Sequence, residues 1–214
     1  MIGYEATITA IEHKRTVAAR DLIRRAVNSG KLVNFDNDCR VQIIRDYNQD
    51  ELLFVNCAPE TLGAHNLQFP TDTDLSKVVL EITERSRFEV DIENIAKYLK
   101  PFREQGMRIA IDDFGAGWSN LPRVEALYPE FLKLDQQVVR HVHTNQQTQG
   151  IVAGMVSFCM RIGVQMIAEG IETREQDTVV KLLGVQIGQG FFYDLPKPAC
   201  QLERRSVSLD KEAY

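Results

Sequence analysis

The chain has 214 residues, of which 44% are hydrophobic and 26% are charged, the balance of an ordinary globular domain. This length can bury a full core without disulfides, and the composition excludes disorder, collagen and coiled coil as the overall class. Its 25 basic and 30 acidic residues give a formal charge of −5, which argues against a broad grip on duplex nucleic acid, so no DNA partner is expected.

Short apolar runs alternate with amphipathic stretches along the whole chain, and this pattern predicts strands separated by helices. We expect strands at residues 2–9, 52–56, 78–82, 107–112, 131–135, 164–168 and 185–188. We expect helices at residues 16–28, 38–47, 91–105, 119–127, 147–161 and 173–184. Pro101 is expected to kink or interrupt its helix, and Thr173 is expected to cap the last one. The polar tail from Glu203 is expected to fray.

The predicted strands are apolar at consecutive positions, which is typical of parallel strands covered by helices on both faces. The fold is then an open doubly wound sheet or a (βα) barrel, and no GxGxxG follows the first strand to indicate a dinucleotide fold. The four scattered cysteines form no CxxC pair, and no targeting or membrane segment is visible. A cytoplasmic protein with reduced thiols is therefore expected.

Polar side chains recur at the ends of these strands. They are Glu5, Asn56, Glu81, Asp112, Asp113, Lys133, Asp135, Glu169, Glu172 and Gln189. In a parallel βα architecture these ends face one rim, where active sites are built. One lysine cannot neutralise five or six converging acids, whereas a divalent cation can.

The chemistry of this set indicates which cation it suits. Carboxylates and one amide carbonyl, without cysteine or histidine, form a hard oxygen set that favours magnesium, manganese or calcium. The adjacent Asp112 and Asp113 point to ligands shared between two ions, the usual device for activating water and displacing a group at phosphorus. Taken singly, each acid is equally explained as a solvated loop residue or a helix cap.

Two other motifs are weaker evidence for a function. His141 and His143 resemble a metal pair, but they lie in a polar stretch without a third ligand nearby, so a solvated loop is the simpler interpretation. Asp113-Phe114-Gly115 matches a kinase tripeptide, but the chain has neither a glycine-rich loop nor an HRD-type catalytic loop.

Seven short motifs occur in a fixed order. They are Glu5-Ala6-Thr7, Val55-Asn56, Leu80-Glu81-Ile82-Thr83-Glu84, the run from Ile111 to Leu121 (IDDFGAGWSNL), Leu132-Lys133-Leu134-Asp135, Ala168-Glu169-Gly170-Ile171-Glu172-Thr173 and Gln189-Gly190-Phe191. Together they resemble the EAL domain of bacterial cyclic di-GMP phosphodiesterases, from Gly3 to about Pro198. The resemblance implies a TIM-like (βα) barrel, incomplete or irregular at the N-terminal strand, and hydrolysis of cyclic di-GMP to linear pGpG with two Mg²⁺ or Mn²⁺ ions.

The resemblance also implies roles for individual residues. Glu5, Asn56, Glu81 and Asp112 would hold the first ion, and Asp113 would help to hold the second. Lys133 would orient the attacking water, Glu169 would accept its proton or join the metal shell, and Glu172 and Gln189 would complete the pocket. Glu84 would fasten the loop from Phe114 to Asn120, which in this family links the substrate site, the metals and a dimer interface, so a homodimer is expected.

The sequence departs from the family pattern at two places. Thr9 stands where the family usually has an arginine that contacts the substrate, and Thr7 replaces a leucine. We expect a phosphodiesterase domain over residues 1–200 and a polar tail at 201–214. The strand that precedes the glutamate strand in the family has no counterpart here, so this domain is expected to expose two sheet edges. These departures favour the alternative, a module that binds cyclic di-GMP or a protein partner without turnover.

Overall fold

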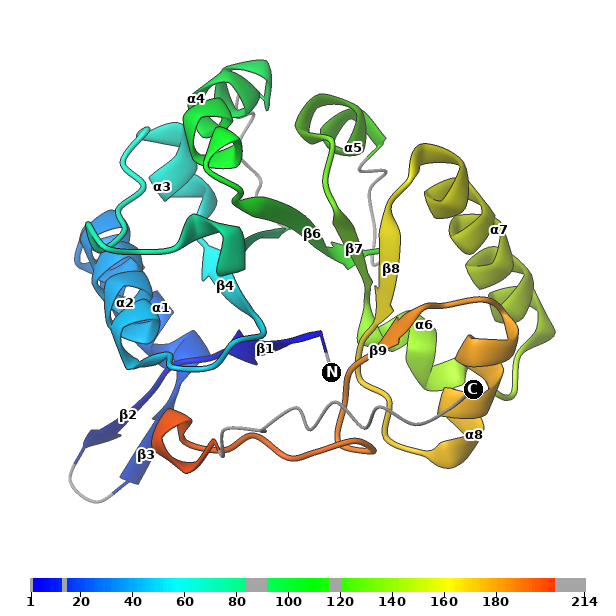
Figure 1. The fold of residues 1–214 in the computed structure, drawn as a ribbon. Coiled ribbons are helices and arrows are strands. Elements are labelled where there is room, and N and C mark those ends of the chain that lie inside the picture. The colour runs from blue at the N-terminus through cyan, green and yellow to red at the C-terminus, as the bar shows by residue number, and fades with distance from the viewer. Residues whose placement is uncertain (1, 13–14, 84–91, 116–120, 203–214) are drawn as a thin grey trace, which may run out of the picture.

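The computed structural model describes residues 2–12, 15–83, 92–115 and 121–202. Seven parallel strands form one curled sheet in the order β1-β4-β5-β6-β7-β8-β9 (Figure 1). They are β1 (Gly3–Ala6), β4 (Leu52–Cys57), β5 (Val78–Thr83), β6 (Arg108–Phe114), β7 (Phe131–Leu134), β8 (Gln165–Ala168) and β9 (Ile187–Gly188). Two further strands, β2 (Thr9–Glu12) and β3 (Arg15–Ala18), pair as an antiparallel hairpin.

Helices follow most of the strands and surround the outer face of the curled sheet (Figure 1). They are α1 (Ala19–Asn28), α2 (Leu32–Asp46), α3 (Pro59–Gly63), α4 (Ile92–Glu104), α5 (Leu121–Leu127), α6 (Gln136–His141), α7 (Gln146–Ile162) and α8 (Arg174–Leu182), with 3-10 turns η1 (Leu75–Lys77) and η2 (Ala199–Gln201). Within the described ranges, none of these helices is long and apolar enough to cross a membrane. The alternation leaves a doubly wound sheet and a (βα) barrel both open, and the curled sheet decides for the barrel.

The strands are buried on both faces, as their sequences predict. In β7, Leu132 and Leu134 pack outward in the same cluster as Val152 of α7. The alternate residue, Phe131, points the other way into an interior layer. That layer consists of Phe54, Val79, Ala110, Phe131 and Ile167, one from each central strand. The inside of the curled sheet is therefore a packed apolar layer at this level.

The barrel is not closed. In the described part of the chain β1 pairs with β4 alone and β9 pairs with β8 alone, so these two strands form free edges. The expectation of a TIM-like barrel that is incomplete at its N-terminal strand is thus confirmed.

Three local predictions were wrong. Residues 15–18 form β3 instead of the start of a helix, because the β-branched Thr16 and Val17 pair across the hairpin with Ile11 and Ala10. Helix α2 begins at Leu32, six residues earlier than expected. Helix α4 continues through Pro101, which is exposed, so water can satisfy the carbonyl that lacks its usual N–H partner.

Candidate metal centre and active site

The candidate site lies in the interior of the curled sheet, next to the apolar layer. Side chains alternate along a strand, so the residue two positions beyond an inward-facing one points inward again. Two positions beyond the layer residues of β4 to β8 come Asn56, Glu81, Asp112, Lys133 and Glu169. Glu5 of β1 stands in register with Phe54, and Gln189 directly follows β9. The register of the strands therefore brings these seven of the ten predicted rim residues into one ring.

Lys133 lies at the centre of this ring and is 1% exposed. Its Nζ atom lies 2.9 Å from Glu5 Oε2, 2.8 Å from Glu169 Oε1 and 3.6 Å from Asp112 Oδ1. The Glu81 carboxylate, which is fully buried, approaches to 2.5 Å as an ion pair, although neither of its oxygens has hydrogen-bond geometry to a partner. Four carboxylates thus share one ammonium group.

Burial raises the pKa of two of these acids. Burial raises the pKa of Glu81 to about 8; the Lys133 charge opposes this shift and the Glu5 charge adds to it. Burial likewise raises the pKa of Glu169 to about 7. The Lys133 charge lowers this pKa, and the Asp112 charge raises it. For Lys133 burial works the other way, but the surrounding carboxylates, Glu81 foremost, hold its pKa well above the usual value. The lysine is therefore a fixed cation, while Glu81 and Glu169 titrate near neutral pH.

Glu5 differs from the other acids of the ring. Burial by itself would raise its pKa, but the Lys133 charge and hydrogen bonds from Gln189, Lys133 and Asn56 hold it below the usual value. The Gln189 amide donates to Glu5 Oε2 at 2.6 Å. Because Gln189 follows β9 and Glu5 belongs to β1, this hydrogen bond joins the two free edges of the sheet across the opening.

A bulge at the end of β6 places both neighbouring aspartates in the site. In a regular strand Asp112 and Asp113 would point to opposite faces. The pairing of β6 with β7 shifts register between Ile111 and Phe114, and Asp113 has a φ of 56°, in the left-handed region. Aspartate tolerates that region better than most residues. As a result, carboxylate oxygens of Asp112, Asp113 and Glu169 lie within 4.8 Å of one another.

The donor set fits a hard divalent cation. The candidate ligand atoms that converge among the described residues are carboxylate oxygens. Oε2 of Glu81 is buried without a hydrogen-bond partner, and Oε1 of Glu81 and Oδ1 of Asp112 have an ion pair with Lys133 but no hydrogen bond. The single ammonium of Lys133 faces the carboxylates of Glu5, Glu81, Asp112 and Glu169, so the ring holds more acids than cations.

Comparison with known proteins identifies the arrangement. The family description of the EAL domain matches residues 1–196. The chain belongs to the EAL domain family. Among its relatives is the cyclic di-GMP phosphodiesterase PdeR of Escherichia coli strain K12, which is 33% identical over 125 residues, 58% of this chain and 19% of the relative.

Solved structures of EAL proteins share the fold. A standalone versatile EAL protein from Vibrio cholerae O395, in its c-di-GMP-bound form, is 28% identical with a TM-score of 0.74 over 89% of this chain and 83% of that one. The manganese and cyclic di-GMP complex of Klebsiella pneumoniae BlrP1 is 27% identical with a TM-score of 0.69 over 81% and 47%. The present EAL domain spans about a fifth of the length of the curated relatives that it matches first.

Some predicted residues of the EAL domain lie elsewhere or cannot be placed. Asp135 is buried and caps α6, accepting from the Gln137 N–H at 2.6 Å, so its position is explained by the helix. Glu172 is exposed, and the described contacts join its backbone N–H to Gln176 rather than its carboxylate to the ring. Glu84, together with Trp118, lies outside the described residues. Thr9, in place of the family arginine, opens β2 and is exposed.

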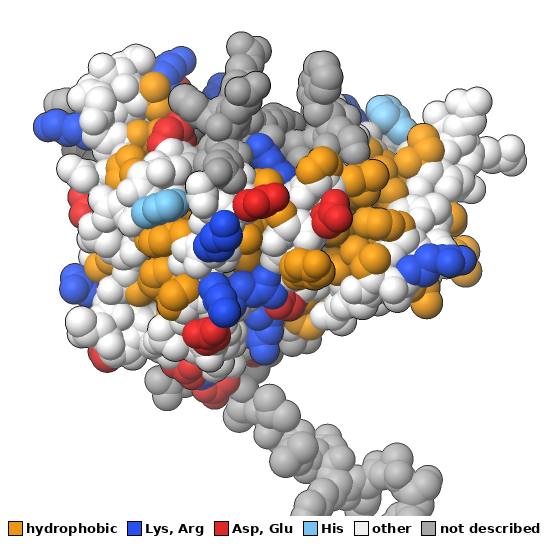
Figure 2. Space-filling view, turned by 90° about the horizontal axis from the view of Figure 1, so that it is seen from above, with side chains coloured by type: hydrophobic (Ala, Val, Ile, Leu, Met, Phe, Trp, Pro, Cys, Tyr) orange, Lys and Arg blue, Asp and Glu red, His pale blue; other side chains and the backbone are white. Residues whose placement is uncertain are grey.

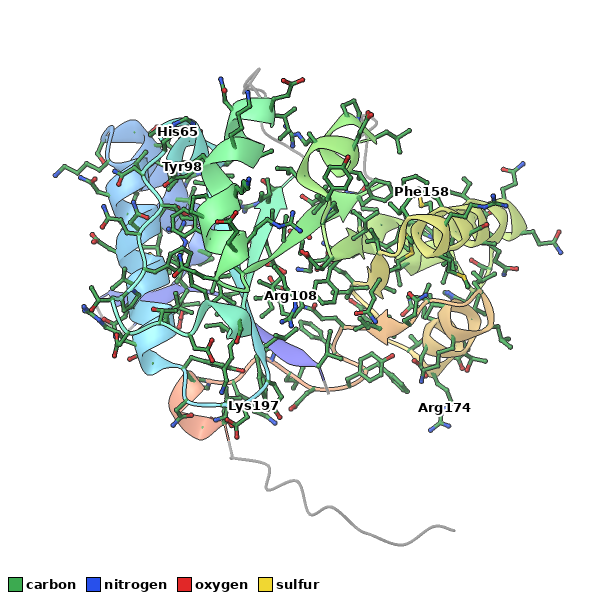
Figure 3. All side chains as sticks on the ribbon, turned by 45° about the horizontal axis from the view of Figure 1, so that its top comes forward. His65, Tyr98, Arg108, Phe158, Arg174 and Lys197 are labelled. Atoms are coloured by element: carbon green, nitrogen blue, oxygen red, sulfur yellow. The ribbon has the colours of Figure 1, made fainter. Side chains whose placement is uncertain are left out.

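The histidines stand apart from the site. His65 is exposed and its ring stacks on Tyr98 with centroids 4.6 Å apart, on the side of α3 and α4 (Figure 3). His141 ends α6 and is exposed. Among the described residues, the group of acids and histidines that could hold a metal contains Asp112, Asp113 and Glu169 and no histidine.

One residue near the site had no signal in the sequence. Arg123 of α5 donates from Nη1 to the Thr83 carbonyl oxygen at 2.9 Å. Thr83 ends β5 and stands in register with Asp112, so this hydrogen bond ties α5 to the backbone beside a candidate ligand. An arginine in a helix does not reveal from sequence which distant carbonyl it will reach.

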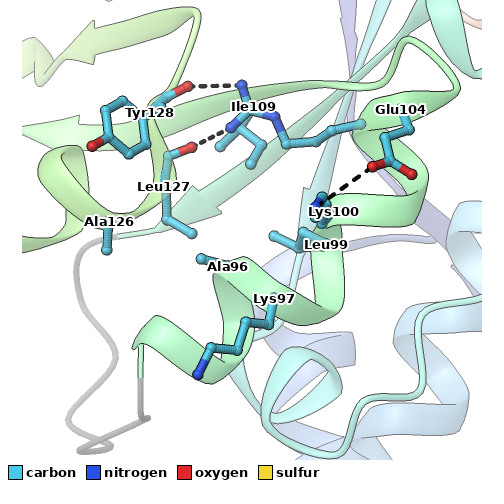
Figure 4. Close-up of a pocket in the computed structure, with 10 residues that line it drawn as sticks. Ala96, Lys97, Leu99, Lys100, Glu104, Ile109, Ala126, Leu127 and Tyr128 are labelled. Carbon is cyan, nitrogen blue, oxygen red and sulfur yellow. Dashed lines mark hydrogen bonds and ion pairs between the residues drawn. The ribbon is translucent and has the colours of Figure 1, made fainter.

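A separate pocket of about 420 Å³ opens between α4 and α5 on the outside of the domain (Figure 4). Ala96, Leu99, Ile109 and Leu127 form its apolar floor, and Arg103 is held there by the carbonyl oxygens of Leu127 and Tyr128. The lining contains none of the ring acids, so this pocket is distinct from the candidate site.

Proposed function

We propose that this EAL domain hydrolyses one phosphodiester bond of cyclic di-GMP and releases linear pGpG in a reaction that requires Mg²⁺ or Mn²⁺. The observation that carries the proposal is the buried ring of four carboxylates around Lys133, beside the Asp112, Asp113 and Glu169 group. The names of PdeR and of the Vibrio cholerae and Klebsiella pneumoniae structures support cyclic di-GMP as the substrate.

Two ions are proposed. Asp112, Asp113 and Glu169 would hold one, because their oxygens already converge. Glu5, Asn56 and Glu81, with Asp112 shared, would hold the other. Such ions activate a water molecule at neutral pH and neutralise the charge that develops on a phosphodiester.

The protein groups have complementary roles. Lys133 carries a permanent charge and donates to Glu5 Oε2, so it can hold a water or a phosphoryl oxygen in a fixed direction. Glu169, whose Oε1 lies 2.8 Å from Lys133 Nζ, would either ligate an ion or accept a proton from the attacking water. Gln189 and Asn56 hold the Glu5 carboxylate ionised. Glu172 would line the substrate side of the pocket and Glu84 would fasten the loop after β6.

A homodimer is the proposed assembly. Figure 2 shows the face that carries α4, α5 and α7, on which apolar side chains gather toward α7. Ile151 and Ile162 of α7 are 55% and 45% exposed and, eleven residues apart, lie on the same side of this helix. An apolar surface of this kind marks a contact with another protein. Light scattering on the purified chain should give twice the monomer mass, and a monomer at all concentrations would contradict this part of the proposal.

The activity is tested by incubating the purified chain with cyclic di-GMP, with and without Mn²⁺, and separating the products. We expect linear pGpG only with metal, and none from Asp112→Asn. His141→Ala, a surface change outside the ring, should cleave as fast as the parent. Metal-independent cleavage, or full activity in Asp112→Asn, would overturn the proposed site.

The alternative is a sensor that binds cyclic di-GMP without cleaving it. Thr9 in place of the family arginine and the two free sheet edges favour it. The same assay distinguishes the two functions, since retention of intact cyclic di-GMP at saturating Mn²⁺ would support the sensor and exclude the hydrolase.

A further inference from the structure

Outside the candidate site, a basic segment forms strand β3, helix α1 and the turn that follows it to Lys31. Residues 15–31 contain a single acid, Asp21, and five basic residues: Arg15, Arg20, Arg24, Arg25 and Lys31. This segment carries a charge of +4, whereas the remaining 20 basic and 29 acidic residues carry −9. The domain is therefore strongly polarised, with a cationic part on an acidic body.

Helix α1 also exposes apolar side chains between these cations. Arg20, Ile23, Arg24 and Val27 follow the i, i+3, i+4, i+7 spacing and so lie on one face of the helix. Ile23 is 44% and Val27 is 52% exposed, and both arginines are exposed. The buried residue of the helix, Ala26, lies on a different side. Arginines interleaved with half-exposed aliphatic side chains are the pattern of a helix that lies on a lipid surface.

We propose that this face of α1 docks on an anionic lipid surface. The arginines would lie among lipid phosphates, and Ile23 and Val27 would enter the headgroup layer. The β2–β3 hairpin extends away from the body beside α1 (Figure 1). The basic segment is therefore a protruding surface, which can contact a flat membrane, and not a groove that would bind a peptide. The polarised charge would turn the acidic body away from the lipid.

The proposal is independent of the hydrolase activity and is tested by co-sedimentation of the full chain with vesicles, in chelator so that divalent ions cannot bridge. We expect binding to phosphatidylcholine vesicles that contain phosphatidylserine, loss of binding without phosphatidylserine, and loss in about 0.5 M salt. Arg20→Gln with Arg24→Gln should weaken binding about thirtyfold. Ile23→Gln with Val27→Gln, at unchanged charge, should weaken it about tenfold.

The matched control is Lys97→Gln with Lys100→Gln, which removes two exposed cations from α4 and should leave binding unchanged. Equal binding to neutral vesicles, no binding to anionic ones, or an equal loss in the control would overturn the proposal. Capture of the chain by polyglutamate, with no sedimentation on anionic vesicles, would overturn it as well and assign the face to an acidic protein.

Discussion

A single ammonium group faces four carboxylates in this EAL domain, and its removal should lower the unfolding free energy of the metal-free protein. Lys133→Met would leave Glu5, Glu81, Asp112 and Glu169 without their cation in a buried ring. We expect the metal-free variant to lose about 3–5 kcal/mol of unfolding free energy at pH 8. At pH 5.5 the loss should be smaller, because the carboxyls can then take up protons. Denaturant unfolding measures both.

The control for this prediction is Lys181→Met on α8. Lys181 also pairs with an acid, Asp177, at 2.8 Å, but its side chain is 62% exposed. An exposed pair contributes little, so the control should lose about 1 kcal/mol or less at either pH. A Lys133→Met penalty as small as the control, or one that does not depend on pH, would contradict the ring as described.

Asp113 separates a backbone requirement from a ligand requirement. Its φ of 56° suits glycine, so Asp113→Gly should keep or slightly raise the unfolding free energy, whereas Asp113→Val should lower it by about 1–2 kcal/mol. Asp113→Asn keeps the shape and removes the charge. Both Asp113→Gly and Asp113→Asn should weaken Mn²⁺ binding by about tenfold or more, as losses at metal sites do. Calorimetric titration of Mn²⁺ tests this, and unchanged affinity in both variants would remove Asp113 from the ligand set.

At the scale of elements, the cap of α8 is the clearest agreement between sequence and structure. Thr173 accepts from the Gln176 N–H, and the Gln176 side chain accepts from the Thr173 N–H at 3.0 Å, which is a capping box. Thr173→Ala should lower the unfolding free energy by about 1 kcal/mol. Thr178→Ala, the same change within the helix at an exposed position, should cost about 0.5 kcal/mol or less. Equal losses would show that the cap contributes nothing.

The elements also show which strands and helices the sequence can predict and which it cannot. The run at residues 78–82 predicts a buried strand because all of its positions except Glu81 are aliphatic, and the structure confirms it as Val78–Thr83. Short helices such as α3 and α6 were missed because a turn or two carries no periodic signal. The hairpin was missed because Val17 fits a helical stripe as well as a strand, and only pairing with Ala10 decides between them.

The candidate site also has features that the sequence predicts and features that it does not. Strand register could be anticipated, so the residues that reach the interior were found at the strand ends. The bulge at Asp113 could not be anticipated, because it depends on how β6 pairs with β7. The central position of Lys133 depends likewise on which face of β7 points inward. The sequence does not indicate that face, because the residues on both faces of β7 are apolar apart from Lys133.

At the scale of the whole molecule, the buried acids should make metal-free stability fall as pH rises. In the folded state the pKa of Glu81 is about 8 and that of Glu169 about 7, both above the ordinary glutamate value of 4.5. Between pH 5 and 8 the folded chain therefore binds more protons than the unfolded chain, and their contribution to stability is lost as pH rises through 7 and 8. The lowered pKa of Glu5 acts in the opposite sense, but below pH 4.5.

Metal binding should show the complementary dependence, because an ion must displace those protons. Denaturant unfolding in chelator should give a decrease that approaches about 1.4 kcal/mol per pH unit for each proton. Mn²⁺ affinity should rise over the same range, and calorimetry in two buffers of different ionisation enthalpy should reveal proton release. Glu81→Gln removes one titrating group and should flatten both dependences. Metal-free stability that is constant or rises from pH 5.5 to 8 would mean that the ring acids are ionised in the folded chain, and the argument for a cation at this site would lose its electrostatic basis.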